Sequence, residues 1–383
     1  MASTGGRNLP KIVDLFSGCG GFSLGAELAG FKSLAAIDID PTLQSGYRRN
    51  FPRSKPIQAS VADIDKSAWR HFIGNARPDG VIGGPPCQGF SWIGKRRKDD
   101  PRNSLLHHFY RHVGLLKPKF FVMENVVGLL DEENIELLHG AIEQVEGRYK
   151  VLEPFTVNAA HYGAATNRRR VVVFGYDPSE FDSITVDQLR PKPPTELLTV
   201  REAISDLPSP VRDRKEGADF GWAEYPSKAL SRLSAYAQRM RKRPKAGLGW
   251  EEAIDYNEKG FVSGLLTTIH SKEVARRYRT TRGGKTDAKT KSYRLEWDGQ
   301  CPTLRAGTGA DKGAFQAVRP LHPGKGRVIT VREAARLQGF PDWFVFHPTK
   351  WHSFRMIGNS VSPVVSLGLM KRIVKKMHVP LAP

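Results

Sequence analysis

Residues 11–30, KIVDLFSGCGGFSLGAELAG, indicate the fold class of this chain. The apolar run 11–16 is typical of a buried strand, and a glycine-rich turn follows it and leads into a helical pattern over 22–30. A strand, a glycine turn and a helix in this order open a βαβ unit, where small residues let a nucleotide-like ligand approach the backbone closely. The segment therefore predicts a parallel sheet and a cofactor site at its edge.

The same alternation continues to about residue 175. Short apolar runs, rich in β-branched or aromatic residues, recur between amphipathic stretches. These runs are 33–38, 80–84, 119–125 and 170–175. The rhythm predicts an α/β fold with a doubly wound, mostly parallel sheet, in which ligands lie at the carboxyl ends of the strands.

Sequence texture divides the chain into three segments. Residues 1–180 form the predicted catalytic and cofactor-binding domain. Residues 181–325 are rich in Pro, Gly and charge without clear strand–helix alternation, which predicts a smaller, irregular, basic second domain. Helical patterning returns in 326–383, and we expect this segment to pack back onto the first domain. The repeated TVREA at 199–203 and 330–334 has the Thr-x-x-Glu form of a capping box and predicts two helix starts.

The charge of the chain favours a polyanionic partner. It has 59 Lys and Arg against 39 Asp and Glu in 383 residues, a formal net charge of +20. Such an excess favours nucleic acid through counterion release, although a soluble protein can also be basic without binding it. The N-terminus lacks the pattern of a signal peptide, and no apolar run approaches the length of a membrane span. We therefore expect a soluble, unexported protein.

Three cysteines, Cys19, Cys87 and Cys301, are too few and too scattered for a disulfide framework, and no CxxC pair indicates zinc. A reducing cytoplasm fits this usage. Cys87 differs from the other two because it lies in GGPPCQGFS (83–91), a proline-stiffened loop just after a predicted strand. A thiol between Pro-Pro and Gln-Gly has little core to fill, so we interpret Cys87 as a nucleophile and the other two as buried and inert.

The glycine turn disfavours a nicotinamide cofactor. Ser23 occupies the position of the third glycine in the GxGxxG fingerprint, so an adenosine without a pyrophosphate fits better. Asp38 ends the second strand, where its carboxylate can accept hydrogen bonds from ribose hydroxyls, and Asp63 can receive an adenine amino group. Alternatively, Asp38 belongs to a turn in which aspartate is only a local cap.

These blocks, from DLFSGCGGFS to GNSVSPVV, resemble the bacterial-type DNA (cytosine-5) methyltransferase family in composition and in order. The resemblance covers the first 175 residues and about the last 55, and the middle segment corresponds to the target recognition domain of the family. It implies the S-adenosylmethionine-dependent methyltransferase fold. It also implies methyl transfer from S-adenosylmethionine to C5 of cytosine in duplex DNA, with S-adenosylhomocysteine as product and no metal.

The resemblance assigns a catalytic role to Cys87, Glu124, Arg168 and Arg170. Cys87 adds to C6 of cytosine, Glu124 acts at N3, and Arg170 contacts the base beside its neighbour Arg168. Taken alone, a Glu at a strand end is equally a surface charge. The family commonly has Gln where this chain has Thr166.

The cofactor site comprises the glycine turn, the ends of later strands and the C-terminal GNSV block. The expected cofactor-binding residues are Phe16, Gly18, Gly20, Gly21, Asp38, Ile39, Asp63, Ile64, Pro85, Asn359, Ser360 and Val361. Family members usually have Glu and an aromatic residue at the positions of Asp38 and Ile39, and Ile39 can still pack on an adenine face.

The target carbon lies inside a stacked duplex, so the base must be flipped out. The basic loop from Gln88 to Arg102 fits a segment that closes over the DNA, although such a run is often only a solvated surface. The expected DNA-binding residues are Gln88, Ser91, Lys95, Arg96, Arg97, Arg279 and Arg282.

Two other functions compete with this interpretation. An RNA cytosine-5 methyltransferase would share the cofactor and the nucleophile, but the long basic middle segment favours double-stranded DNA. A catalytically silent DNA-binding module would have no reason to keep Cys87, Glu124 and the glycine turn together. An amino-methylating enzyme would carry an Asp/Asn-Pro-Pro-aromatic motif instead of Pro-Pro-Cys. We expect a monomer in the bacterial cytoplasm, nucleoid-associated through DNA, alongside a cognate restriction endonuclease that acts separately.

Overall fold

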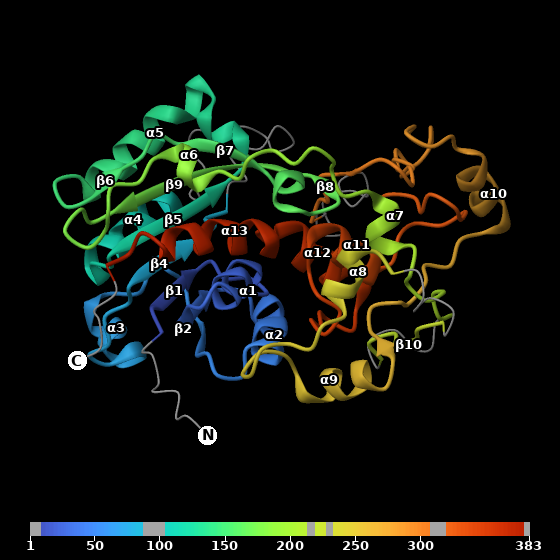
Figure 1. Ribbon diagram of the computed structural model, residues 1–383, viewed down its shortest axis with the longest axis horizontal. Coiled ribbons are helices and arrows are strands. Elements are labelled where there is room, and N and C mark those ends of the chain that lie inside the picture. The colour runs from blue at the N-terminus through green and yellow to red at the C-terminus, as the bar shows by residue number, and fades with distance from the viewer. Residues whose placement is uncertain (1–8, 87–103, 213–218, 227–232, 307–318, 379–383) are drawn as a thin grey trace.

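The computed structural model describes residues 9–86, 104–212, 219–226, 233–306 and 319–378 (Figure 1). Its centre is an eight-stranded sheet with the order β3-β2-β1-β4-β5-β9-β6, in which β7 also pairs with β9. The strands are β1 Lys11–Leu15, β2 Lys32–Asp38, β3 Pro56–Gln58, β4 Gly80–Gly83, β5 Phe120–Asn125, β6 Lys150–Val151, β7 Phe155–Asn158 and β9 Arg169–Tyr176. The predicted α/β fold is confirmed.

The first five strands are parallel to one another, and the later ones reverse. β3, β2, β1, β4 and β5 pair in parallel, whereas β9 pairs antiparallel with β5, β6 and β7. The carboxyl ends of β1, β2, β4 and β5 therefore meet at one edge of the sheet, where the sequence predicts ligands.

Alternating side chains along each strand supply two cores, one on each face of the sheet. Ile12 and Phe120 point to the face covered by α1 Gly21–Leu28, α6 Val186–Leu189 and α13 Pro363–Val374. Val13 and Phe121 point to the face covered by α3 Lys66–Ile73, α4 Ser104–Leu116 and α5 Glu132–Ile142. Both faces are covered, as a sheet of continuous apolar strands requires.

The last helix of the chain lies directly on the first. A Cβ at Gly25 of α1 would lie 2.3 Å from Ser366 Cβ and 2.4 Å from the Leu367 amide nitrogen, both on α13. The Ser366 hydroxyl donates to the Phe22 carbonyl over 2.6 Å. The C-terminal segment thus packs against the sheet domain, while the exact domain boundaries at 180 and 325 stay a prediction.

The small lobe, which we define as the described residues between 199 and 328, consists of short elements joined by long loops (Figure 1). Its elements are α7 Val200–Ile204, β10 Ala223–Glu224, α8 Ala235–Met240, α9 Glu251–Glu258, β11 Phe261–Val262, α10 Lys272–Thr280 and β12 Cys301–Pro302. After it the chain forms α11 Val331–Gln338 and α12 Lys350–Asn359. Thr199 and Thr330 each form a complete capping box, which confirms the two predicted helix starts.

A third core joins the sheet domain to the small lobe. It combines Tyr47 of α2 Pro41–Asn50 with Val200 of α7 and with Phe344. Cys19 and Cys301 are both buried in it, which confirms the prediction that they fill space. The two parts of the chain therefore share apolar packing.

Beside this core lies a buried ionic cluster centred on Arg336 of α11. Its guanidinium donates to both carboxylate oxygens of Asp342, over 2.5 and 2.7 Å, and to Asp206 over 3.2 Å. Asp206 also accepts from Arg241 over 2.6 Å, and Asp342 accepts from the Tyr225 hydroxyl. Burial disfavours ionisation of Asp342, but Arg336 outweighs it and lowers the pKa of that carboxyl. The cluster connects α11 to the small lobe.

Candidate active site

The glycine turn follows β1 in the chain and contacts the carboxyl end of β2. Gly18 and Gly20 adopt positive φ angles of 55° and 96°, a region that favours glycine. The Gly18 amide donates to Asp38 Oδ2 over 2.8 Å, and the Asp40 amide donates to Asp38 Oδ1 over 2.8 Å. Asp38 is therefore held in place by backbone donors, and burial raises the pKa of its carboxyl.

The turn also meets the C-terminal GNSV block, nearly 340 residues later. A Cβ at Gly21 would lie 1.9 Å from Ser360 Oγ and 2.3 Å from the Val361 carbonyl oxygen. Only glycine leaves room for this contact. The structure thus brings together two blocks that the sequence analysis assigned separately to the cofactor.

Several features of this turn fit a nucleoside ligand. The hydroxyl of Ser17 is buried and has no hydrogen-bond partner among the described residues. The position that a Cβ of Gly18 would occupy is open, with no atom within 4 Å. The side chain of Ile39 is 68% exposed, which is unusual for a large apolar residue next to a strand end. Asp63 is exposed and Ile64 is buried beside it.

The buried carboxylate of Asp14, in β1, fixes Ser23 next to the glycine turn, and it was not predicted from the sequence. Ser23 donates to Asp14 over 2.6 Å, and the Tyr47 hydroxyl donates to Ser23 over 3.0 Å. Burial raises the pKa of Asp14 to about 7. The one available signal was Ser23 itself, which occupies the third-glycine position of the dinucleotide fingerprint and uses its hydroxyl to reach β1.

Glu124 and Arg170 form the central pair of the site. Glu124 Oε1 lies 3.0 Å from Arg170 Nε, and the two side chains are only 11% and 15% exposed. They come from β5 and β9, whose antiparallel register places Glu124 opposite Val172. Glu124 is therefore a buried carboxylate at the strand end and not a surface charge, the alternative that the sequence alone left open.

The loop after β4 lies against this pair. A Cβ at Gly84 would lie 3.4 Å from Glu124 Oε2, and the Asn125 side-chain amide donates to the Pro85 carbonyl over 3.4 Å. Asn125 is a positioning residue that was not singled out from the sequence, where it is only the last residue of the apolar run 119–125. The described chain stops at Pro86, the residue before Cys87 in the sequence.

Arg168 is buried and holds three separate segments together. It donates to the carbonyl oxygens of Leu304, Gly358 and Ser360 over 3.3, 3.1 and 3.0 Å. Burial, followed by the charge of Arg170, lowers the pKa of Arg168 to about 9, which leaves it protonated at neutral pH. These bonds define a positioning role, since they direct the guanidinium to backbone atoms.

Thr166 has a structural role at the position where the family commonly has glutamine. It lies in β8 Thr166–Asn167, which pairs in parallel with β12, and it is fully buried. Its hydroxyl donates to the Cys301 carbonyl over 3.0 Å. Thr166 therefore connects the small lobe to the segment that leads through Arg168 into β9, which carries Arg170.

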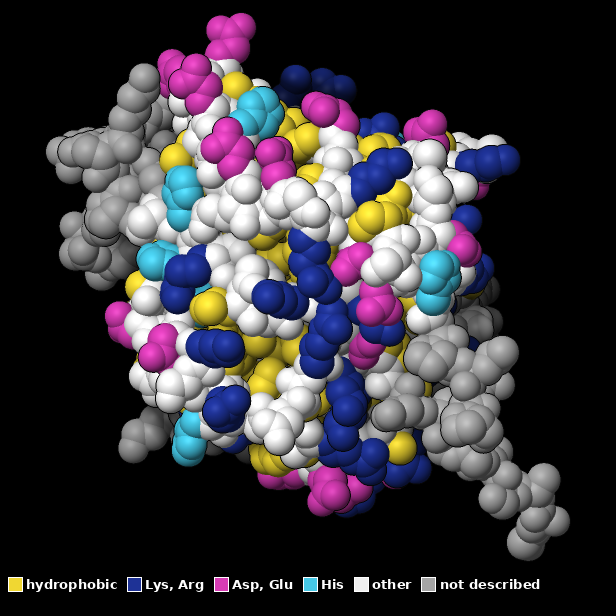
Figure 2. All heavy atoms as spheres, turned by 90° about the vertical axis from the view of Figure 1, so that its left-hand side faces the viewer, with side chains coloured by type: hydrophobic (Ala, Val, Ile, Leu, Met, Phe, Trp, Pro, Cys, Tyr) yellow, Lys and Arg dark blue, Asp and Glu magenta, His cyan; other side chains and the backbone are white. Residues whose placement is uncertain are grey.

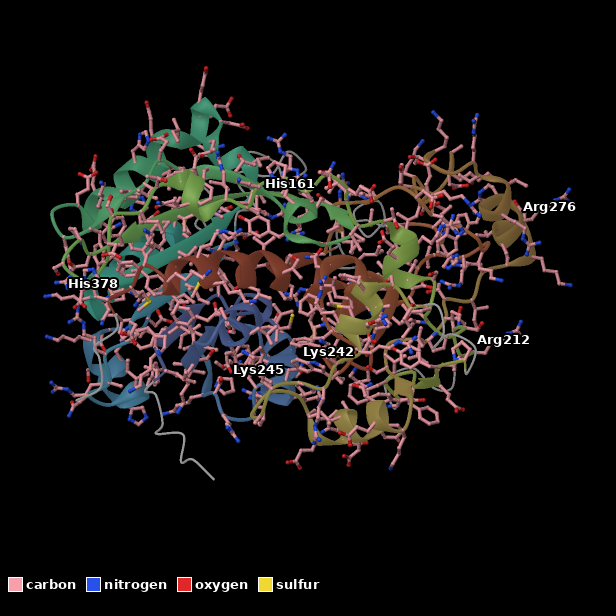
Figure 3. The ribbon with its side chains drawn as sticks, in the orientation of Figure 1. His161, Arg212, Lys242, Lys245, Arg276 and His378 are labelled. Atoms are coloured by element: carbon pink, nitrogen blue, oxygen red, sulfur yellow. The ribbon has the colours of Figure 1, made fainter. Side chains whose placement is uncertain are left out.

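The remaining predicted residues lie elsewhere. Arg279 and Arg282 are exposed on and just after α10, in the small lobe, and do not meet the Glu124–Arg170 pair. Figure 3 places Arg276 of the same helix at the outer end of that lobe. The predicted residues Cys87, Gln88, Ser91, Lys95, Arg96 and Arg97 fall outside the described part of the chain. Within the described ranges no group of three or more His, Cys, Asp or Glu is arranged to hold a metal, and no helix could cross a membrane.

The fold and this site define a class. The mostly parallel sheet with its flanking helices has the fold of solved methyltransferases, among them Dnmt2 of S. pombe, at 14% identity and a TM-score of 0.61, covering 96% of this chain and 98% of the other. That likeness concerns the fold. A closer structure, an E. coli prophage-encoded protein described as a DNA modification methyltransferase, aligns at 39% identity and a TM-score of 0.85, covering 96% of this chain and 99% of the other.

The chain belongs to the C-5 cytosine-specific DNA methylase family, whose model matches residues 10–375. Type II methyltransferase M.XorII of Xanthomonas oryzae pv. oryzae is 40% identical over 379 residues, covering 96% of this chain and 85% of the relative. M.AgeI of Thalassovita gelatinovora is 31% identical, covering 95% and 99%. The chain is thus a DNA cytosine methyltransferase, in agreement with the sequence prediction.

Proposed function

We propose that this enzyme transfers a methyl group from S-adenosylmethionine to C5 of a flipped-out cytosine in double-stranded DNA, through a covalent bond between Cys87 and C6. The observation that carries the proposal is the buried Glu124–Arg170 pair beside the Pro85–Pro86 loop that leads into Cys87. The family supplies the reaction class, and these residues supply a means of performing it.

The chemistry requires a nucleophile because C5 of neutral cytosine reacts poorly with a methyl sulfonium. The thiolate of Cys87 adds to C6, forming an S–C6 bond and making C5 an enamine carbon. C5 then takes the methyl group, water removes the C5 proton, and the S–C6 bond breaks to release the thiolate. Every bond made to sulfur is therefore broken again in one turnover.

Glu124 and Arg170 would stabilise the electron density that moves towards N3 when the thiolate adds to C6. Glu124 in its protonated form would donate a proton or a strong hydrogen bond at N3, and Arg170, whose Nε lies 3.0 Å from Glu124 Oε1, would supply positive charge beside it. Arg168 would position Arg170, because it connects the start of β9 to the carbonyl oxygens of residues 304, 358 and 360. Asn125 in turn fixes Pro85.

S-adenosylmethionine supplies a transferable methyl group on a sulfonium. Asp38 would accept from the ribose hydroxyls, Ile39 would pack on the adenine, and Ser17 would find a partner for its buried hydroxyl. The open position at Gly18 would allow the cofactor to approach the backbone closely, while Gly21 leaves room for Ser360 and Val361, which close the other side of the turn. No metal is needed for this chemistry.

Positive charge in the loop containing Lys95–Arg97 and in the small lobe, including Arg279 and Arg282, would hold the duplex and help to flip the base. The names of the relatives place them in type II restriction-modification, so a separately acting cognate endonuclease is part of the proposal. We further propose a monomer in the bacterial cytoplasm, associated with the nucleoid through DNA.

The test is covalent trapping. The protein is incubated with S-adenosylmethionine and duplex DNA of mixed sequence containing 5-fluorocytosine, beside the Cys87→Ser variant as control. Because fluorine at C5 cannot leave as a cation, elimination is blocked and a Cys87-dependent protein–DNA adduct accumulates. An adduct with 5-fluorocytosine RNA alone would transfer the assignment to RNA, and no adduct despite bound cofactor would support a silent DNA-binding module.

A further inference from the structure

The parallel strands begin at the edge of the sheet opposite the active site, which we call the amino edge. Lysines stand at the entry of most strands along it: Lys11 opens β1, Lys32 opens β2, Lys55 precedes β3, Lys119 precedes β5 and Lys150 opens β6. Neighbouring strands lie about 4.8 Å apart, so the six steps from β3 to β6 span roughly 30 Å. That length is close to one turn of a DNA duplex.

Figure 2 looks onto this edge and shows Lys and Arg side chains in a continuous band from its centre downwards, with acidic side chains to either side. Figure 3 places His378, at the end of the chain after α13, on this same side of the molecule, at the opposite end of the long axis from Arg276 of the small lobe. The band therefore faces away from the small lobe.

Pairing and hydrogen bonds bring several cations of this edge together around Lys119. The register of β5, β9 and β6 places Phe120 and Lys150 on either side of Tyr176, so the starts of β5 and β6 lie two strand spacings, about 10 Å, apart. The His378 amide donates to the Glu180 carbonyl, and Lys119 pairs with the Glu180 carboxylate over 3.1 Å, which brings in the end of α13. We define the cluster by the cations on or next to these contacts: Arg77, Lys117, Lys119, Arg148, Lys150, Lys375 and Lys376.

Some cations of the cluster already form ion pairs or hydrogen bonds with other residues of the protein. Lys119 is shared between Asp79 and Glu180, Arg148 pairs with Asp177, and Arg77 donates to the Lys117 carbonyl at the end of α4. Cations near helix C-termini are stabilising in their own right. These residues do not require an external partner.

Three lysines of the cluster have no such interaction with another described residue. Lys117, Lys150 and Lys375 are exposed, and none forms an ion pair or a side-chain hydrogen bond with another described residue. They form the unneutralised surface of the cluster, and we call them the amino-edge lysines. Unneutralised, clustered lysines repel one another, so an anionic partner would stabilise them.

The amino edge is too far from the active site to serve the same stretch of DNA. β5 rises about 3.3 Å per residue, so Lys119 lies roughly 16 Å from Glu124 along the strand, with the sheet between them. Charges separated by more than a Debye length of about 8 Å are largely screened at physiological salt. A duplex in the active-site cleft would leave the amino-edge lysines unneutralised.

We propose that the amino edge is a second, sequence-independent binding surface for duplex DNA, engaged while another segment occupies the active-site cleft. Duplex DNA fits the band because its phosphates repeat over the same length and because the family's substrate surrounds the enzyme. Holding two segments at once lets the protein move from one segment to another without first dissociating from both.

The test compares two triple variants that lose the same charge. The edge variant is Lys117→Gln/Lys150→Gln/Lys375→Gln, and the control is Arg48→Gln/Lys66→Gln/Lys259→Gln, which removes three exposed cations from α2, α3 and the end of α9. Sedimentation with excess duplex of about 20 bp at low salt counts the duplexes bound per chain. We expect two for the native protein and the control, and one for the edge variant.

A second measurement reports the phosphate contacts directly. The affinity of the native protein and of the control for the second duplex should fall as salt rises, with a logarithmic slope of about 3 or more in magnitude, since each phosphate contact contributes roughly 0.9. One duplex per native chain, or two in an edge variant with a native unfolding midpoint, would overturn the proposal. So would loss of binding to phosphatidylglycerol vesicles with both duplexes retained, which would identify a membrane surface. Because no methyl transfer is measured, these outcomes are separate from that of the trapping experiment.

Discussion

Replacing Arg336 by Met should strongly destabilise the protein. The substitution removes the guanidinium from two buried carboxylates, but their losses differ. Asp206 keeps Arg241 at 2.6 Å, whereas Asp342 keeps the neutral Tyr225 hydroxyl and the charge of Arg332, without a hydrogen-bonded cation among the described residues. Removing the hydrogen-bonded partner of a buried charge costs about 3–5 kcal/mol in comparable sites. That is a large share of the roughly 5–15 kcal/mol by which most domains are stable.

Urea unfolding at pH 8 and at pH 5 measures the effect. The loss in the free energy of unfolding should be smaller at pH 5, because Asp342 without Arg336 has a raised pKa and relieves its charge by binding a proton. Arg336→Met/Asp342→Asn should regain part of the stability. The matched control is Arg201→Met, which breaks the exposed pair with Asp298 and should leave the midpoint unchanged. A loss below about 1 kcal/mol for Arg336→Met would refute the reasoning.

Three further predictions concern the site. Glu124→Gln should lower the single-turnover methylation rate by about 10²–10⁴-fold while DNA affinity stays within a few fold, because a general acid acts only in the chemical step; an equal loss of DNA binding would contradict this. Gly21→Ala should weaken binding of S-adenosylhomocysteine in calorimetry, since its Cβ would lie 1.9 Å from Ser360 Oγ, whereas Gly140→Ala, with no atom within 4 Å, should not. Burial raises the pKa of Asp14 from its ordinary value of 3.8 to about 7, so between these pH values the folded state holds a proton that the unfolded state has lost. Stability relative to Asp14→Asn should therefore fall by up to about 4 kcal/mol as pH rises from 4 to 7, and equal pH profiles of the two proteins would exclude this titration.

Local patterns predicted the sheet domain because its signals are local. Apolar runs fix strands, the glycine turn fixes the ligand edge, and the TVREA capping boxes fix the starts of α7 and α11. The direction of β9 was not predictable in this way, since a run of valines has the same composition whether it runs parallel or antiparallel to β5. The fold class survives because most of the sheet was already determined by residues 11–125.

The site was predictable only where the resemblance assigned residues. Arg168 was grouped with the catalytic residues, yet its partners are carbonyl groups at 304, 358 and 360, which no local pattern connects to it. Arg332 and Arg336 are fully buried although arginine is usually exposed, because their partners come from residues up to 133 positions away. Sequence patterns do not show which polar groups will pair when they lie far apart along the chain.

The packing of α13 on α1 has a consequence for synthesis of the enzyme. Gly21 and Ser360 form one site, so the cofactor turn is incomplete until the last helices leave the ribosome. At about 5–20 residues per second, the interval between the two helices is roughly 20–70 s. During that time the nascent sheet lacks both the cover over α1 and the second wall of the proposed cofactor site. On that proposal, a chain whose translation stops early cannot act on the genome, and methylation begins only with finished molecules.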